Sequence, residues 1–188
     1  MTNEELCHAL NYVNATRENR SKMAFKIEEN PQLIPILIEI SKDDIDPISC
    51  KASWVVESLI KKKLEFIFPY IDTFTHSLSR LTLESSIRPA SKICSLLVEN
   101  QYSNKTSLSN KVLNKQHLNT IAEAAFDWLI GDHKVAPKAY SMTTLLLLGK
   151  NITWIHPELQ GILKQNFENG SAAYKARARM TLKALKKS

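Results

Sequence analysis

The sequence predicts an all-α protein made of antiparallel helix pairs, and three observations support this. Apolar residues between positions 31 and 63 recur with a helical period on both sides of a short polar turn. No segment alternates between apolar and polar residues for long enough to form a strand. The turn that leads into the second helix of a pair recurs along the chain, first after 38 residues. Because one pair leaves an apolar face open, we expect the pairs to stack.

Residues 31–63 show the design of one pair. Asp46 is expected to accept hydrogen bonds at the start of the second helix, and Pro47 fits its first position, where no N–H is needed. The apolar stripe of the first helix consists of Leu33, Ile34, Leu37 and Ile38, and the second helix is expected to bury Ile48, Ala52, Val55, Val56, Leu59 and Ile60.

The other segments follow the same pattern in order. Two short helices come first, the second capped by Thr16 or Asn19. Residues 64–81 form a helix that Pro69 either kinks or delays, and residues 84–100 form its partner. Further helices are expected at about 116–130, 135–149, 155–168 and 171–186, which makes ten helices in five pairs.

One polar stretch interrupts the pattern, and the chain otherwise reads as a single domain over residues 1–188. Residues 101–114 are rich in Asn and Ser near their start and are predicted to form an exposed insertion. The last helix, 171–187, is basic and is expected to cap the stack.

The recurring turn carries a resemblance to a known family. It reads Asp46-Pro-Ile-Ser-Cys-Lys-Ala-Ser, then Glu84-Ser-Ser-Ile-Arg-Pro-Ala-Ser, then Asp132-His-Lys-Val-Ala-Pro-Lys-Ala. This pattern resembles the HEAT-repeat, armadillo-like family over nearly the whole chain. The resemblance implies an α–α superhelix of about five HEAT-like pairs, whose second helices line a concave face. The chain departs from the family at the position where an arginine is favoured, which holds Cys50, Ala136 and Tyr174.

Composition excludes several classes of protein. The hydrophobic fraction of 44% argues against disorder, and the longest apolar run, residues 145–149, is far shorter than the roughly 20 residues of a membrane-spanning helix. The amino-terminal residues show no signal peptide, so we expect a cytoplasmic location and no membrane partner. Three cysteines without paired spacing are expected to be reduced thiols.

The net charge of +6 is concentrated at one end of the chain. Residues 1–163 contain 18 Lys+Arg and 18 Asp+Glu, whereas residues 164–188 contain 7 Lys+Arg and only Glu168. This basic end forms one stripe on the last helix, either as the polar outer face of a terminal repeat or as a contact for an acidic partner or a nucleic-acid backbone. The stripe consists of Lys175, Arg179, Lys183 and Lys186.

A set of groove residues follows from the register of the turn. The favoured arginine position and the residue four positions later share a helix face, which places Trp54, Arg88, Lys92 and Tyr140 in one row. Glu57 is the only acidic side chain within a turn of Trp54. Such a row can stack bases and bind phosphates, and it is similar to HEAT-like DNA alkylation repair glycosylases, whose groove combines aromatics, an arginine and a carboxylate. Alternatively, Trp54 and Tyr140 pack in the core or between repeats.

The sequence contains no catalytic signature. The five histidines form no His-x-x-x-His pair, Cys-x-x-Cys is absent, and four glycines leave little room for a phosphate loop, so neither a metal nor a cofactor is expected. Ser85, Ser86, Pro89 and Lys92 partly match the Ser-Ser-x-Met-Pro-x-Lys signature of the fumarase and adenylosuccinate lyase superfamily. The methionine is missing and the lysine comes one residue late.

These patterns favour a non-enzymatic scaffold that presents a concave surface for protein–protein binding. The alternative is a nucleic-acid-binding module, related to the HEAT-like DNA alkylation repair glycosylases through the groove residues. A third alternative is a lyase or another enzyme.

Overall fold

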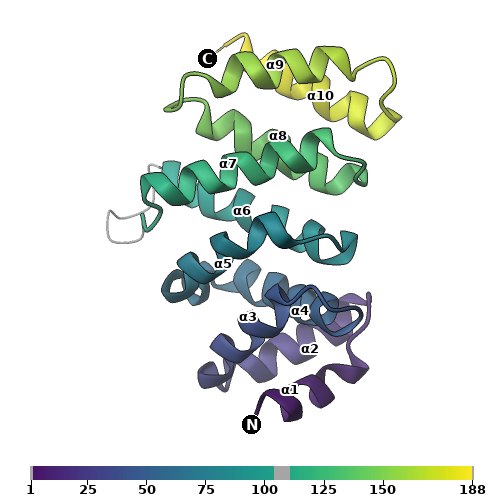
Figure 1. Ribbon diagram of the computed structural model, residues 1–188, viewed down its shortest axis with the longest axis vertical. Helices are drawn as coiled ribbons and strands as arrows, with labels where there is room; N and C mark the ends of the chain where they lie inside the picture. The colour runs from purple at the N-terminus through teal and green to yellow at the C-terminus, as the bar shows by residue number, and fades with distance from the viewer. Residues whose placement is uncertain (1, 104–110, 188) are drawn as a thin grey trace. The chain divides into compact units, whose positions relative to one another are not determined.

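The computed structural model describes residues 2–103 and 111–187 of the 188-residue chain. Within these residues every regular element is a helix, which confirms the all-α prediction (Figure 1). The α-helices are α1 (Asn3–Ala9), α2 (Arg17–Glu28), α3 (Ile34–Lys42), α4 (Ile48–Lys62), α5 (Ile71–Ser77), α6 (Glu84–Tyr102), α7 (Lys115–Ile130), α8 (Val135–Leu148), α9 (Ile155–Gln165) and α10 (Ala172–Leu185). The 3₁₀ helices are η1 (Leu10–Tyr12), η2 (Pro31–Leu33), η3 (Leu64–Tyr70) and η4 (Leu78–Arg80).

The chain divides into two compact units, Met1–Ile93 and Cys94–Ser188, with the boundary inside α6. Each unit is considered by itself below. A single domain over residues 1–188 stays a prediction.

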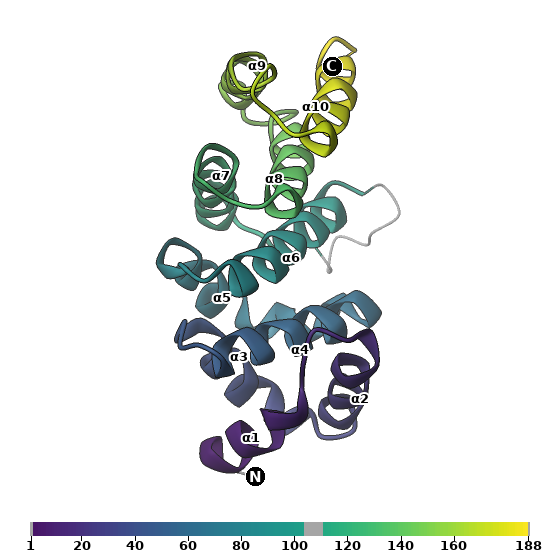
Figure 2. The same cartoon turned by 90° about the vertical axis from the view of Figure 1, so that its right-hand side faces the viewer.

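The first unit has two layers of helices. In one layer α3 contacts both α1 and α5, and in the other layer α2 contacts α4 (Figure 2). The layers meet where α3 packs on α4. Leu6, Leu37, Leu59, Ile67 and Ile87 are almost fully buried in this core. The helical spacing of the apolar residues therefore produced the predicted pairing of α3 with α4.

The second unit repeats this arrangement. Helix α8 contacts α7, α9 and α10, and α9 contacts α10. Ile121, Leu129, Leu145, Leu159 and Ala178 are buried in its core. The predicted helices at 135–149 and 155–168 end one and three residues earlier than expected, at Leu148 and Gln165.

At the helix starts, the N-cap predicted for α2 is correct and the one predicted for α4 is wrong. Thr16 caps α2, accepting a hydrogen bond from the Asn19 N–H at 3.4 Å. Asp46 does not cap α4, because Pro47 takes the N-cap position and leaves Asp46 outside the first turn. The Ser49 hydroxyl closes this turn instead, accepting from the Ile45 N–H at 3.0 Å and donating to the Ile40 carbonyl at 2.7 Å.

Pro69 delays the helix predicted at 64–81, which is one of the two expected outcomes. The segment runs as η3 through Pro69, and α5 begins at Ile71. A proline lacks the N–H of the α-helical ladder and its ring clashes with the preceding turn, so the α-helix starts after it.

The polar insertion at 101–114 begins later than expected. Gln101 and Tyr102 still belong to α6, and the Gln101 amide hydrogen-bonds both the N–H and the carbonyl of Leu113 at 3.2 Å. These two bonds satisfy the backbone polar groups of Leu113. The spacing of apolar residues cannot predict bonds of this kind. Residues 104–110 of the insertion lie outside the described residues.

Candidate anion-binding cleft

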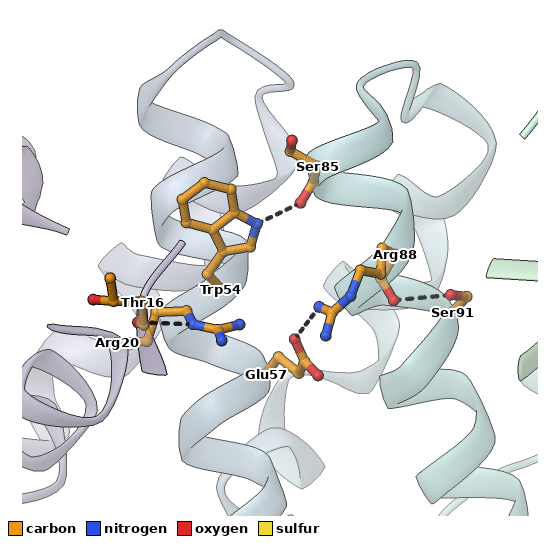
Figure 3. A network of polar contacts seen from close by, with 7 residues as sticks. All are labelled: Thr16, Arg20, Trp54, Glu57, Ser85, Arg88 and Ser91. Carbon is orange, nitrogen blue, oxygen red and sulfur yellow. Dashed lines mark hydrogen bonds and ion pairs between the residues drawn. The ribbon is translucent and has the colours of Figure 1, made fainter. Parts of the chain in front are cut away.

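Helices α2, α4 and α6 line a cleft of about 530 Å³ in the first unit. Figure 3 shows its centre, where the guanidinium groups of Arg20 and Arg88 point toward the same space beside Trp54 and Glu57. Arginine and lysine dominate the wall. The lining residues are Arg17, Arg20, Ser21, Trp54, Glu57, Ser58, Lys61, Lys62 and Arg88.

Helix α4 supplies one wall because Trp54, Glu57, Ser58 and Lys61 follow an i, i+3, i+4, i+7 spacing. The Trp54 ring is partly exposed, and its Nε1–H donates to the Ser85 carbonyl at 2.9 Å (Figure 3). This bond fixes the orientation of the ring. A fixed and partly exposed indole is a suitable surface for stacking a planar group.

Arg88 and Glu57 form an ion pair across α4 and α6. The Arg88 Nη1–H donates to the Glu57 Oε2 at 2.7 Å, and the Glu57 side chain is only 3% exposed whereas that of Arg88 is 38% exposed. A buried carboxylate requires a partner, since an unpaired charge inside a protein is strongly unfavourable. Glu57 therefore holds the Arg88 guanidinium at the cleft while contributing little negative charge to its surface.

Helix α2 supplies the opposite wall. The Arg20 Nε–H donates to the Thr16 carbonyl at 3.2 Å, which orients the guanidinium, and Arg17 lies one turn away. Lys62 of α4 pairs with Glu28 at 3.5 Å between Nζ and Oε2. Five cations and one buried carboxylate thus surround the cleft, and such an excess attracts anions.

Three of the predicted groove residues meet in this cleft: Trp54, Glu57 and Arg88. Lys92, one turn beyond Arg88 on α6, does not line it. Tyr140 lies on α8 in the second unit and is not a lining residue either. The cleft is therefore a local site of the first unit, built on one predicted aromatic residue and one predicted arginine.

Sequence reasoning missed four of the five cations: Arg17, Arg20, Lys61 and Lys62. Residues 1–163 have no net charge, because their acidic residues are as numerous as their basic ones. A count of charges therefore gave no sign of a local cluster of cations. One signal was present in the sequence. Lys61 falls seven residues after Trp54, and therefore on the same face of a predicted helix.

The predicted basic stripe lies on α10 and at its end. Arg179, Lys183 and Lys186 are exposed, and Lys175 is partly exposed. Of the α10 residues one position before each member of the stripe, Tyr174 and Ala178 are buried, whereas Leu182 and Leu185 are only partly buried. Burial raises the pKa of the Tyr174 phenol, against a smaller opposing effect of the nearby Asn166 side chain.

Two of the residues that suggested a lyase, Ser85 and Ser86, have structural roles. Ser85 binds Trp54 through its carbonyl, and the Ser86 side chain is fully buried beside Cys50, with 3.7 Å between the Ser86 Oγ and the Cys50 Sγ. A buried hydroxyl in the first turns of α6 has no access to a substrate.

The thiols and histidines show no reactive or metal-binding arrangement among residues 2–103 and 111–187. All three cysteines are free, and burial raises the pKa of the Cys50 and Cys94 thiols, which keeps them protonated. Within the same described ranges no three His, Cys, Asp or Glu residues gather as metal ligands. In that part of the chain, no helix is long and apolar enough to cross a membrane.

In comparisons with known proteins, no family model, no curated protein and no solved structure matches this chain.

Proposed function

We propose that the protein is a helical-repeat binding module whose first unit binds single-stranded nucleic acid in the cleft between α2, α4 and α6. The observation that carries this proposal is the combination of five cations with one fixed aromatic ring in the same concave site. Nucleic acid is the ligand class that offers phosphates and planar bases together.

The chemistry of each wall suggests a mode of binding. Arg17, Arg20 and Lys61 would contact phosphates, and a base would stack on Trp54. Arg88 would bind through the N–H groups that its bond to Glu57 leaves unused, since a guanidinium has five donors. An unpaired base reaches an aromatic ring more readily than a base in a duplex, and for this reason we favour a single strand.

Binding rather than catalysis is the function that this geometry supports best. One oxygen of the Glu57 carboxylate already accepts from Arg88, and the side chain is almost fully buried. The ion pair therefore positions the Arg88 guanidinium at the cleft. The relation to DNA alkylation repair glycosylases stays a prediction from resemblance.

The test is fluorescence anisotropy with a labelled oligonucleotide of about 20 nucleotides, as single-stranded DNA and as RNA. If four cations contact phosphates, log K against log salt should fall with a slope near −2.8, that is about −0.7 for each contact. Arg20→Glu with Lys61→Glu should weaken binding about a hundredfold, since two attractions become repulsions.

Lys22→Glu with Lys26→Glu is the matched control. Both lysines lie exposed on α2 and outside the cleft, so this variant makes the same change in net charge. Equal weakening by the two variants, or no binding at about 50 mM salt, would remove the proposal.

A second candidate is the capture of a protein partner by the same face, as the sequence first suggested. It is favoured by Phe25, which is 53% exposed and lies under Lys62, with 5.8 Å from the Nζ to the ring centroid. Capture of a partner that persists at high salt and is lost on Phe25→Ser would favour this candidate over nucleic acid.

A further inference from the structure

A second concave site lies in the second unit, between the end of α9 and α10. It is a groove of about 410 Å³, and its lining residues on α10 and at the C-cap of that helix follow an i, i+3, i+4, i+7 spacing along one helix face. The lining residues are Lys164, Phe167, Glu168, Arg179, Leu182, Lys183 and Lys186.

The floor of the groove is apolar and its rim is basic. Phe167 and Leu182 are partly buried. Two cations lie over the Phe167 ring, with the Lys175 Nζ at 6.0 Å and the Arg179 Cζ at 5.5 Å from the centroid.

The charge of the rim is not neutralised within the unit. Across residues 2–103 and 111–187, none of the four lining cations forms an ion pair with an acidic side chain: Lys164, Arg179, Lys183 and Lys186. Glu168 is the only acidic residue in the lining. An electrostatically complementary ligand therefore carries several negative charges around an apolar centre.

We propose that this groove binds an acidic amphipathic peptide segment of a partner protein. One or two large apolar side chains of the segment would pack on Phe167 and Leu182, and its carboxylates would meet the basic rim. An amphipathic helix that places its apolar face in a groove is a recurring mode of peptide recognition. A phosphodiester backbone carries the charge but has no aliphatic side chain for the apolar floor, and for this reason we favour a peptide.

The probe is a fluorescein-labelled synthetic peptide of about four helical turns, with leucines on one face and glutamates elsewhere. One control peptide replaces the leucines with glutamine and keeps the charge. Another replaces the glutamates with glutamine and keeps the leucines. Anisotropy should show binding of the first peptide and at least about tenfold weaker binding of each control.

The protein variant is Arg179→Glu with Lys183→Glu, which should weaken binding of the peptide about tenfold. Lys115→Glu with Lys150→Glu is the matched control, since both residues are exposed in the same unit and lie outside the groove. All four positions are on the surface, so circular dichroism should show unchanged helicity.

Three results would overturn this inference: no binding of the probe, equal binding of the peptide without leucines, or equal weakening by the two variants. A fourth result would overturn the inference and favour nucleic acid as the ligand of the groove. That result is the loss of oligonucleotide binding in Arg179→Glu with Lys183→Glu but not in the matched control. The first three outcomes do not depend on the cleft of the first unit, so the two proposals can fail separately.

Discussion

The cleft of the first unit and the groove of the second are both cationic, but they are built differently. In the cleft, Arg88 is bonded to buried Glu57, Arg20 to the Thr16 carbonyl and Trp54 to the Ser85 carbonyl. In the groove, the rim consists of exposed lysine and arginine side chains around an apolar floor. The cleft therefore has fixed donors in defined positions, whereas the groove has flexible charges that can adapt to a ligand.

The two units also differ in net charge. Residues 1–93 carry 12 Lys+Arg and 13 Asp+Glu, a net charge of −1, whereas residues 94–188 carry 13 and 6, a net charge of +7. In the first unit the fold brings together cations of three helices, α2, α4 and α6, although the unit as a whole is almost neutral. In the second unit basic residues already outnumber acidic ones in composition. Local geometry and net charge are thus separate sources of an anion-binding surface.

The largest expected effect is on affinity: reversing the charges of one site should weaken binding of its own ligand and not of the other ligand. Arg20→Glu with Lys61→Glu should weaken oligonucleotide binding about a hundredfold and leave binding of the acidic peptide within about twofold. Arg179→Glu with Lys183→Glu should show the reverse selectivity, with about tenfold weaker binding of the peptide. Anisotropy titrations of both probes against both variants measure this, and loss of both ligands in either variant would show that the sites are not distinct.

The next largest effect is expected on stability, because only the cleft contains a buried charge. Arg88→Ala should lower the free energy of unfolding by about 2 kcal/mol, since Glu57 loses its partner. This value is below that of a fully buried pair because Arg88 is 38% exposed. Arg179→Ala should change it by less than about 0.5 kcal/mol.

Urea unfolding followed by circular dichroism measures both variants. A second substitution, Glu57→Gln, should restore part of the stability of Arg88→Ala, because a neutral amide is less costly to bury than a carboxylate. Equal and small effects of Arg88→Ala and Arg179→Ala would mean that the ion pair of the cleft is no more structural than the groove cations.

The fold could be predicted from the sequence because its main determinant is local. The apolar spacing between residues 31 and 63 fixes which face of each helix is buried, and that face decides the pairing of α3 with α4. The failure at Asp46 has the same origin. Whether Pro47 is the first residue of the helix or the residue before it depends on the backbone conformation at that single residue.

The candidate sites could be predicted only in part, since each combines residues of different segments. Trp54 and Arg88 lie on equivalent helix faces of two pairs, and the helical spacing identified Arg179 and Lys183. Phe167 was missed because it lies just after α9 in a connection without periodicity. Arg17 and Arg20 were missed because the contact of α2 with α4 is tertiary.

A smaller effect is expected at the aromatic residues. Trp54→Phe removes the bond to the Ser85 carbonyl and should lower the free energy of unfolding by about 1 kcal/mol. Trp154 in the second unit is the comparison, since it is 51% exposed and stacks on Phe126 at 5.5 Å between centroids. Trp154→Phe should change stability by less than about 0.5 kcal/mol, because the ring stacking can persist. Urea unfolding measures both, and the reverse order of effects would contradict a fixed Trp54.

The smallest effect is a pH dependence that compares one buried thiol of each unit. Burial raises the pKa of Cys50 and of Cys94, so both thiols keep their protons in the folded protein, whereas in the unfolded chain they titrate near 9.0. Unfolding then releases protons above that pH, and the free energy of unfolding should fall as pH rises. For Cys94 the fall should be about 0.8 kcal/mol at half a pH unit above 9.0. The loss due to Cys94 should exceed that due to Cys50, because burial raises the pKa of Cys94 more strongly than that of Cys50. At Cys50 burial and the nearby Asp46 and Asp44 raise the pKa, whereas the hydrogen bond with Ser86 lowers it. Urea unfolding at pH values from about 8 to about 9.5 should therefore show a flatter profile for Cys94→Ala than for Cys50→Ala, and identical profiles would mean that the two thiols are equally shielded from water.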